Sequence, residues 1–374
     1  MRKLKLYLLS AASFLLVSLV VFWIAELLIR HSVLSSSTER RDHLVETSYI
    51  PVKLKSHYQG IFWEVPFSTN QYGFRGESDF SKTPETGEYR ILSLGDSIGF
   101  GLGILSSTHY SQVLERNLNQ KTSSQKFHVI NAGGQGYSPS NYYVYLKHEG
   151  LQFRPRMVIV EIELCNDITD EALLHWEMER DKSERLRAVR GGRYILSWDG
   201  NLLATYSVGS YFFEKTYVYT DLLRRSLNLL YRLSPTEPFH SQSQNGVCYY
   251  NLGFDKYLLD EQRVESGWQR TFRSLVATHR LLEENAIPFL LMIMPSRYMF
   301  DEDCGAWSTF AGQLVKRAVG EAQQIGLPYL DLSQAIEEGG GSRLYFDFAH
   351  LTEQGNRVVG EALAEYLAVE LLSY

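Results

Sequence analysis

The sequence predicts an α/β fold in which a five-stranded, mostly parallel sheet lies between two layers of helices. Three observations predict it. Short apolar runs bounded by turn residues recur along the chain, and longer segments with helical periodicity separate them. The runs are apolar on both faces, as in strands that helices cover on both sides. The chain of 374 residues is 44% hydrophobic and 21% charged, which is enough apolar material for one enlarged α/β domain.

Five apolar runs mark the expected strands. The first starts at Tyr89 and ends at Leu94, just before Gly95. The other four cover residues 128–131, 157–162, 289–294 and 328–332. Helical periodicity is found at 111–119, 142–149, 260–285, 306–325 and 353–372. Parallel strands need crossover connections, so this alternation predicts a three-layer α/β/α arrangement.

The N-terminus has the pattern of a membrane anchor. Arg2, Lys3 and Lys5 precede an uncharged stretch at 6–25, which as a helix is long enough to cross a hydrocarbon core about 30 Å thick. Residues 1–30 are therefore expected to form a cytoplasmic tip and a transmembrane signal-anchor. The alternative is a cleaved signal peptide, but the apolar run is long for one and no clear cleavage site follows. We expect a single-pass protein of the cell membrane, with its main domain on the extracytoplasmic, periplasmic side.

The rest of the chain divides into a stalk and a domain. Residues 31–88 show no sustained helical or strand period and are expected to form a stalk that packs onto the domain, which spans 89–374. An insertion at about 169–251 interrupts the alternation, with an expected hairpin at 193–203 and an amphipathic helix at 220–233. Ligands of open parallel sheets bind at the carboxyl ends of strands, so we expect this insertion to cover the site. The alternative is a surface subdomain with no role in the site.

Charge and cysteine content restrict the partners and the compartment. A net charge of −6, with no basic stripe, argues against binding to nucleic acid. Of the three cysteines, Cys248 and Cys304 are able to pair in an oxidising compartment, which leaves Cys165 free. Unpaired, buried thiols are the alternative.

A serine lies where a parallel sheet binds its ligands. Ser97 follows the first strand and is flanked by Gly95, Gly99 and Gly101. A tight turn there exposes the hydroxyl. If a helix begins just after it, the free N–H groups of the helix favour the oxyanion that forms when the hydroxyl attacks an acyl carbonyl.

A carboxylate and an imidazole lie close together near the C-terminus. Asp347 precedes His350 by three residues, in an expected loop before the final helix. One short loop is then able to present both side chains, so that the carboxylate fixes the tautomer of the ring while the ring accepts the serine proton. The three residues predict a catalytic triad with Ser97 as nucleophile, His350 as general base and Asp347 orienting the histidine.

These motifs resemble the SGNH hydrolases, also called GDSL esterases and lipases, from Tyr89 to the C-terminus. The first block is similar to 95–97, the second to 131–136, the third to 166–167 and the last to 347–355, and the segment 70–75 is similar to one in membrane-anchored bacterial members. The resemblance implies a flavodoxin-like SGNH fold and an oxyanion hole made by the backbone N–H of Gly136 and the side chain of Asn166, with no cofactor and no metal. The chain departs from the family at Leu164 and Cys165, where many members have glycine.

The sequence thus predicts serine-dependent hydrolysis of acyl esters, with envelope glycans or lipids as candidate substrates. Two alternatives stay open: an O-acyltransferase acting on a cell-surface polysaccharide, and a catalytically silent glycan-binding module tethered to the membrane. A metal-dependent phosphoesterase is less compatible, because a two-metal site needs more ligands than Asp96, Asp167, Asp347 and His350 supply. An α/β-hydrolase is less compatible, because in this chain the serine follows the first strand and the acid lies three residues before the histidine. Glu161 and Glu163, on one face of an expected buried strand, have no evident role.

Overall fold

A computed structural model describes residues 2–31, 44–45, 47, 49–50, 53–63, 65–76, 78–122, 124–173, 178–180, 186–189, 192–196, 202–207, 261–301 and 304–372. The chain divides into two compact units. One contains residues 1–42 and 191–236, and the other contains residues 43–190 and 237–374.

The first unit contains the N-terminal helix and a hairpin. Helix α1 spans Arg2–His31. Strands β10 (Gly192–Leu196) and β11 (Leu202–Ser207) pair antiparallel, which confirms the predicted hairpin, while the expected turn at 198–201 and the helix at 220–233 lie outside the described residues. Across the described ranges, no helix combines the length and the apolar character needed to cross a bilayer.

The second unit is built on the predicted sheet. Its strands, in the order in which they follow along the chain, are β5 (Glu88–Leu94), β6 (Lys126–Asn131), β7 (Met157–Glu163), β12 (Phe289–Met294) and β13 (Tyr329–Asp331). They lie in the order β13-β12-β7-β5-β6, and every neighbouring pair is parallel. This is the flavodoxin-like order, in which the chain adds its second strand on one side of the first and then continues on the other side.

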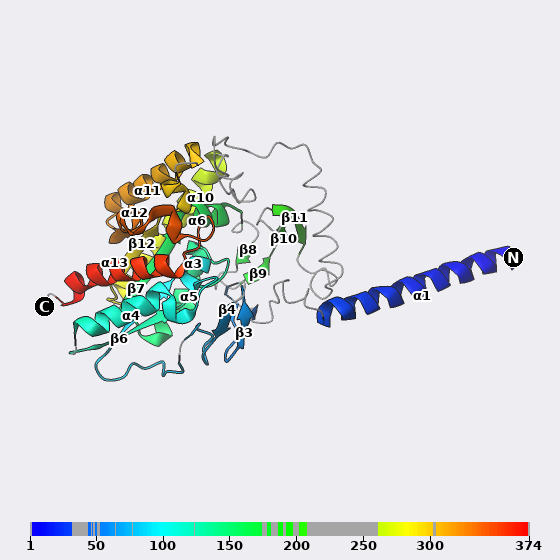
Figure 1. Ribbon diagram of the computed structural model, residues 1–374, viewed down its shortest axis with the longest axis horizontal. Coiled ribbons are helices and arrows are strands. Elements are labelled where there is room, and N and C mark those ends of the chain that lie inside the picture. Colours follow the sequence, from blue (N-terminus) through cyan, green and yellow to red (C-terminus); the bar gives the residue numbers. More distant parts are fainter. Residues whose placement is uncertain are drawn as a thin grey trace. The chain divides into compact units, whose positions relative to one another are not determined.

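Helices cover both faces of this sheet (Figure 1). One apolar cluster joins alternate residues such as Leu92 and Val160 to helices α5 (Pro139–His148), α6 (Leu164–Leu173), α10 (Glu261–Glu284) and α11 (Ala306–Gln324). The intervening residues, such as Ile91 and Ile159, face a second cluster with α4 (Tyr110–Lys121), α12 (Ser333–Gly339) and α13 (Glu353–Leu372). The strands are therefore buried on both sides, which explains why they read as continuous apolar runs.

Several short elements were not predicted. The segment 31–88, expected to lack strands, contains two antiparallel pairs: β1 (Leu44–Val45) with β2 (Lys53–Leu54), and β3 (Gln59–Phe62) with β4 (Val65–Ser68). Strands of two to four residues are too short to show an alternating pattern. The same holds for strands β8 (Met178–Arg180) and β9 (Leu186–Val189) and for the 3-10 helices η2 (Ser106–Thr108), η3 (Gly150–Phe153), η5 (Arg297–Phe300) and η7 (Gly341–Leu344). The short helix α3 (Ser97–Phe100) lies where the sequence analysis considered the start of a helix.

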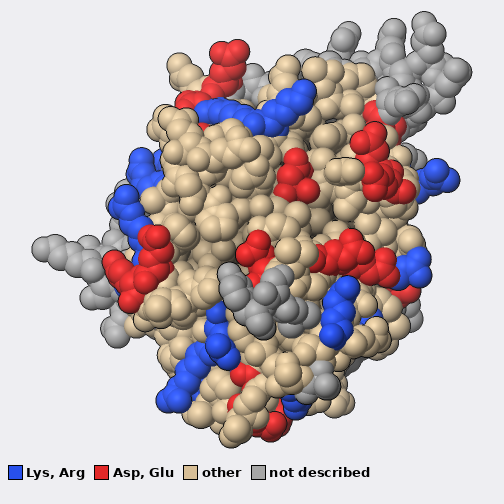
Figure 2. Space-filling model, turned by 90° about the vertical axis from the view of Figure 1, so that its left-hand side faces the viewer, with Lys and Arg blue, Asp and Glu red and all other residues tan. Residues whose placement is uncertain are grey.

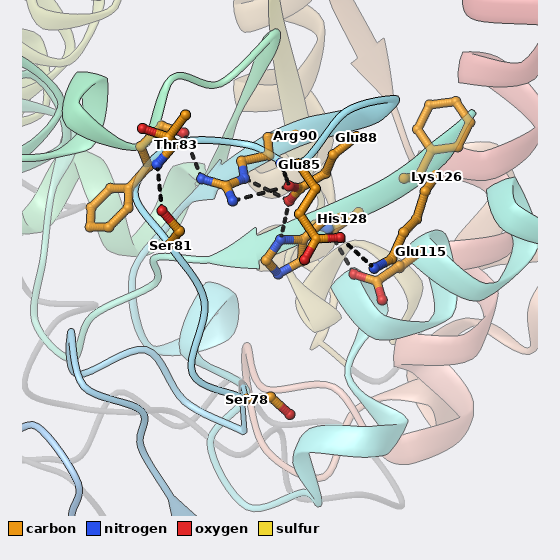
Figure 3. Close-up of polar contacts among 12 residues, drawn as sticks. Ser78, Ser81, Thr83, Glu85, Glu88, Arg90, Glu115, Lys126 and His128 are labelled. Carbon is orange, nitrogen blue, oxygen red and sulfur yellow. Dashed lines mark hydrogen bonds and ion pairs between the residues drawn. The ribbon is translucent and has the colours of Figure 1, made fainter.

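A buried ionic cluster binds the segment before β5 to the amino-terminal ends of the strands (Figure 3). The Arg90 guanidinium donates to both carboxylate oxygens of Glu88, at 2.7 and 3.1 Å, and to the carbonyl oxygens of Lys82 and Phe153. His128 Nδ1 lies 2.9 Å from Glu88 Oε1. Burial alone raises the pKa of Glu88, but hydrogen bonds from Arg90 and the other donors outweigh it and lower this pKa to about 2. The segment before β5 is thus held at the amino-terminal ends of the strands, whereas Ser97 follows the carboxyl end of β5.

Charged side chains are mixed on the face drawn in Figure 2, where basic and acidic residues lie side by side. Exposed ion pairs include Arg317 with Glu265 at 2.7 Å and Lys126 with Glu85 at 3.6 Å. Such pairs contribute about 0–1 kcal/mol each. The fold therefore rests on the two apolar clusters.

Candidate active site

The sheet order places the candidate residues at its switch point. Ser97 follows β5 and Asn166 lies in the first turn of α6, directly after β7. These two neighbouring strands are where the chain changes direction across the sheet, and ligands of such folds bind outside their carboxyl ends. Asp347 and His350 lie between η7 and α13.

A tight turn at 95–101, called here the nucleophile turn, presents Ser97. The fully buried Asp96 caps the short helix α3, and its Oδ1 accepts the N–H of Ile98 at 2.7 Å. Gly101 ends this helix with a left-handed backbone. Ser97 is partly exposed, whereas its neighbours Asp96 and Ile98 are buried.

The structure joins the three predicted triad residues in one chain of hydrogen bonds. Ser97 Oγ lies 2.8 Å from His350 Nε2, and His350 Nδ1 lies 2.7 Å from Asp347 Oδ2. The other carboxylate oxygen, Asp347 Oδ1, accepts the backbone N–H groups of Ala349 and His350 at 2.9 and 2.7 Å. With Nδ1 donating to the carboxylate, Nε2 is left to accept the serine proton. Residues 253 positions apart in the sequence are thus in proton-transfer geometry.

Charge at this site favours a protonated histidine. Burial alone lowers the pKa of His350, but the Asp347 carboxylate and, more weakly, Asp96 raise it above its ordinary value. Burial also raises the pKa of Asp347, but His350 and the two backbone N–H groups outweigh this effect and lower it. An imidazolium formed during the reaction is therefore stabilised by a carboxylate that stays ionised.

Three aromatic rings surround His350. The Phe346 ring is nearly parallel to it, at 14° and 5.7 Å between centroids, while Phe348 lies at 6.1 Å and Trp63 at 6.3 Å. Phe346 and Trp63 are 40% and 46% exposed. Trp63, in the turn between β3 and β4, has a φ of 51°, in the left-handed region that non-glycine residues rarely adopt. The sequence analysis did not assign these aromatic residues to the site.

The two predicted oxyanion donors lie on loops tied to the nucleophile turn. The side-chain amide of Asn166 donates to Asp96 Oδ2, and its backbone N–H donates to Glu163 Oε2 at 2.7 Å. In this conformation one amide hydrogen of Asn166 therefore points at Asp96, and its second one is left for an oxyanion. Gly136 follows β6 and has a φ of 67°, which favours glycine. Their role as donors stays a prediction.

Glycine is required where the loop after β6 meets the nucleophile turn. A Cβ at Gly133 would overlap the backbone of Gly99 and Phe100. The N–H of Gly134 donates to the carbonyl of Gly95 at 3.0 Å. The second motif block is thus packed backbone to backbone against the first.

Arg75 supports the nucleophile turn from the other side. It is buried, and its guanidinium donates to the carbonyl oxygens of Phe100 (2.9 Å), Gly101 and Ile104. It also lies 4.6 Å from the centroid of the Phe100 ring. Burial lowers the pKa of Arg75 to about 10. The sequence pointed to this residue only as the end of the segment 70–75, without a role.

His109 is a second supporting residue that the sequence left without a role. Its Nδ1 accepts the N–H of Ser111 at 3.2 Å, and its Nε2 lies 3.2 Å from the carbonyl oxygen of Ile98. Burial and then the charge of Arg75 lower the pKa of His109 to about 3, so it stays neutral. It therefore acts as a fixed hydrogen-bonding link, and a lone histidine in a sequence carries no signal for that.

The cysteines divide into two kinds. Cys304 is disulfide-bonded, so the alternative of an unpaired thiol there is wrong, and Cys248 lies outside the described residues. Cys165 is buried at the start of α6. In the ranges that the structure covers, no group of three or more His, Cys, Asp or Glu residues has a geometry that would hold a metal ion.

Comparisons with known proteins give structural likenesses only. No known protein family matches the sequence, and no curated protein matches it either. Similar solved structures include a GDSL-like lipase from Bacteroides thetaiotaomicron (11% identity, 78% of this chain and 93% of that chain, TM-score 0.38) and a lipase/acylhydrolase from Enterococcus faecalis (14%, 75% and 96%, 0.36). A third is an acetylxylan esterase from Geobacillus stearothermophilus (11%, 74% and 93%, 0.39). At these identities and TM-scores, an activity has to be argued from the site itself.

Proposed function

We propose that this protein is a serine hydrolase that cleaves acyl esters through an acyl-enzyme. The hydrogen-bonded chain from Ser97 through His350 to Asp347 carries the proposal. A buried, carboxylate-oriented imidazole against a partly exposed serine hydroxyl is the arrangement that makes the hydroxyl a nucleophile.

The geometry supports a two-step reaction. Ser97 Oγ attacks the carbonyl carbon while His350 Nε2 takes the hydroxyl proton. The oxyanion is held by the backbone N–H groups of Ser97 and Gly136 and by the side-chain amide of Asn166. When the tetrahedral intermediate collapses, the bond to the alcohol oxygen breaks and His350 returns the proton to that oxygen. Water then attacks the acyl-enzyme with His350 again as base, which releases the acid and restores the serine hydroxyl.

The alcohol part of the substrate is proposed to be a sugar of an envelope glycan. Trp63 and Phe346 present exposed aromatic faces beside His350, where the leaving alcohol must receive its proton. The flat carbon-hydrogen faces of a pyranose ring pack on such aromatic surfaces, while its hydroxyl groups stay in water. A lipid chain is the competing substrate.

We also propose that the catalytic domain lies outside the cytoplasm of a membrane-anchored protein. The disulfide at Cys304 supports an oxidising compartment, because such bonds are rare in the cytosol. The basic residues before the apolar stretch at 6–25 support the anchor.

Ser97→Ala tests the hydrolase proposal. We expect the variant to fold and to lose at least about 10³-fold in kcat on acetyl esters, since the nucleophile is removed. Free acid and acylated oligosaccharide should be measured together, because the same acyl-enzyme would donate to a sugar hydroxyl in an acyltransferase. Full activity of Ser97→Ala would show that another group performs the reaction.

A further inference from the structure

Four carboxyl groups are buried together behind the nucleophile turn. Glu161 and Glu163 extend from β7, Asp96 from the turn and Asp167 from α6, and all four are fully buried. Among the described residues, no ion pair joins any of them to a lysine or arginine. Four adjacent carboxylates cannot all be ionised without a compensating cation, so at least one must hold a proton.

Hydrogen bonds distinguish the four groups. Asp96 accepts from Ile98 and Asn166, and Glu163 Oε2 accepts the N–H of Asn166. Asp167 accepts the hydroxyl of Tyr142 at 3.1 Å and the N–H of Glu163 at 2.8 Å. For Glu161, neither carboxyl oxygen has a hydrogen-bond partner. A negative charge therefore has the least support on Glu161.

Glu161 also lies directly against the turn that carries Ser97. A Cβ at Gly95 would overlap Glu161 Oε2, and one at Gly99 would lie 3.2 Å from it. These two glycines flank Asp96, Ser97 and Ile98, so the carboxyl group of Glu161 forms the floor of the nucleophile turn. Any change in its charge or volume acts on the backbone of Ser97.

The electrostatic surroundings agree with this placement. Burial, then the charges of Asp96 and Glu163, raise the pKa of Glu161 well above its ordinary value. The N–H groups of Asp96 and Gly99 are directed at it and offset part of this effect, without reaching hydrogen-bond geometry.

We infer that Glu161 holds a proton in the working protein and is a positioning residue, whose neutral carboxyl group supports the backbone of Ser97. The inference rests on the proposed esterase function. An ionised Glu161 would be repelled by the charge of Asp96. It would also destabilise the oxyanion that forms on the substrate's carbonyl oxygen when Ser97 attacks. A neutral carboxyl fills the same volume without this penalty.

The inference makes activity depend on pH in the alkaline range. The groups that face Glu161 are Asp96 on the turn, Glu163 on its own strand, Tyr110 on α4, Tyr142 on α5 and Asp167 on α6, while Met292 pairs with it from β12. None of these brings a positive charge. Ionisation of Glu161 at high pH should therefore lower kcat.

Three variants test the positioning role. Glu161→Ala removes the floor of the turn and should lower kcat by about a hundredfold, with little change in KM, because a small displacement of the nucleophile is enough for such a loss. Glu161→Gln keeps the volume in a neutral group, so it should restore kcat to within about threefold of the parent and remove the alkaline limb. Asp170→Asn, a control at another buried carboxyl, should change neither.

Infrared difference spectroscopy of the unmodified protein against Glu161→Gln tests the proton directly and does not depend on activity. We expect the band of a protonated carboxyl at neutral pH. A carboxylate band instead, or a Glu161→Gln variant as slow as Glu161→Ala, would overturn the inference. If Glu161→Ala fails to fold, the spectrum and the pH profile of Glu161→Gln decide alone. Full esterase activity in Ser97→Ala would contradict the proposed function, and with it the positioning role of Glu161. The infrared spectrum would still show whether the carboxyl group of Glu161 is protonated.

Discussion

His350 combines a raised pKa with a fixed tautomer. Its Nδ1 donates to a carboxylate that two backbone N–H groups hold in place, so the ring is oriented without help from a substrate. The base must be neutral to accept the serine proton, and its pKa lies above the ordinary value. We therefore expect kcat/KM to fall as the pH drops through that raised pKa.

Asp347→Asn tests this account of His350. Loss of the carboxylate removes the main cause that raises the pKa of His350, so the acid limb of kcat/KM should move to lower pH. The amide also favours the wrong tautomer, and kcat should fall by up to about 10⁴-fold. Glu265→Gln, which removes an exposed carboxylate paired with Arg317, is the matched control and should leave the profile unchanged. An unshifted acid limb in Asp347→Asn would contradict the assignment.

The structure brings together the three side chains that the sequence analysis selected for a triad, and their catalytic role stays a prediction. Ser97, Asp347 and His350 could be selected from the sequence because a serine, an aspartate and a histidine in this order are typical of acyl-transfer chemistry. Arg75 and His109 act through backbone carbonyl groups that only the folded chain brings to them. Glu161 was recognised as odd, but the sequence could not show that its carboxyl lies under Gly95 and Gly99.

Among the elements, the hairpin of β3 and β4 reaches the site although the sequence analysis missed it. It holds Trp63 in a left-handed conformation 6.3 Å from His350. Such a conformation costs about 1–3 kcal/mol, and it persists where surrounding structure imposes it. The long elements were predicted well, because β12 is a continuous apolar run, β7 begins with four apolar residues and α10 is strongly periodic, whereas strands of four residues leave no such signal.

Trp63→Ala tests whether this hairpin binds a sugar. We expect KM for an acetylated oligosaccharide to rise about tenfold, as expected for the loss of one aromatic packing contact. Hydrolysis of a small alkyl acetate should change by less than about twofold, since that ester has no ring to pack. Ile61→Ala, on the same hairpin at 74% exposure, should leave both substrates unaffected. Equal losses on the two esters would argue for a general effect on His350 instead.

At the scale of the whole molecule, the strand order decides where the candidate site lies. Because β6 and β7 flank β5, the loops after all three strands meet at one edge, and the last loop before α13 returns to that edge. The strand count and the parallel direction followed from the sequence. Its resemblance to a flavodoxin-like family supplied the order, since apolar runs alone do not say which strands are neighbours.

The proposed extracytoplasmic location of the catalytic domain is tested on the whole chain. A protease-cleavable tag after Tyr374 should be cut in intact spheroplasts, and non-reducing peptide mapping should find Cys304 oxidised in the cell. Protection of the tag from protease would contradict the extracytoplasmic location.

Covalent labelling tests the central claim most directly, because it measures whether His350 activates the hydroxyl of Ser97, 253 positions away in the sequence. A fluorophosphonate probe should react with Ser97 alone, as located by peptide mass spectrometry, and His350→Ala should lose this labelling although Ser97 is intact. Labelling of a different serine, or undiminished labelling in His350→Ala, would contradict the account.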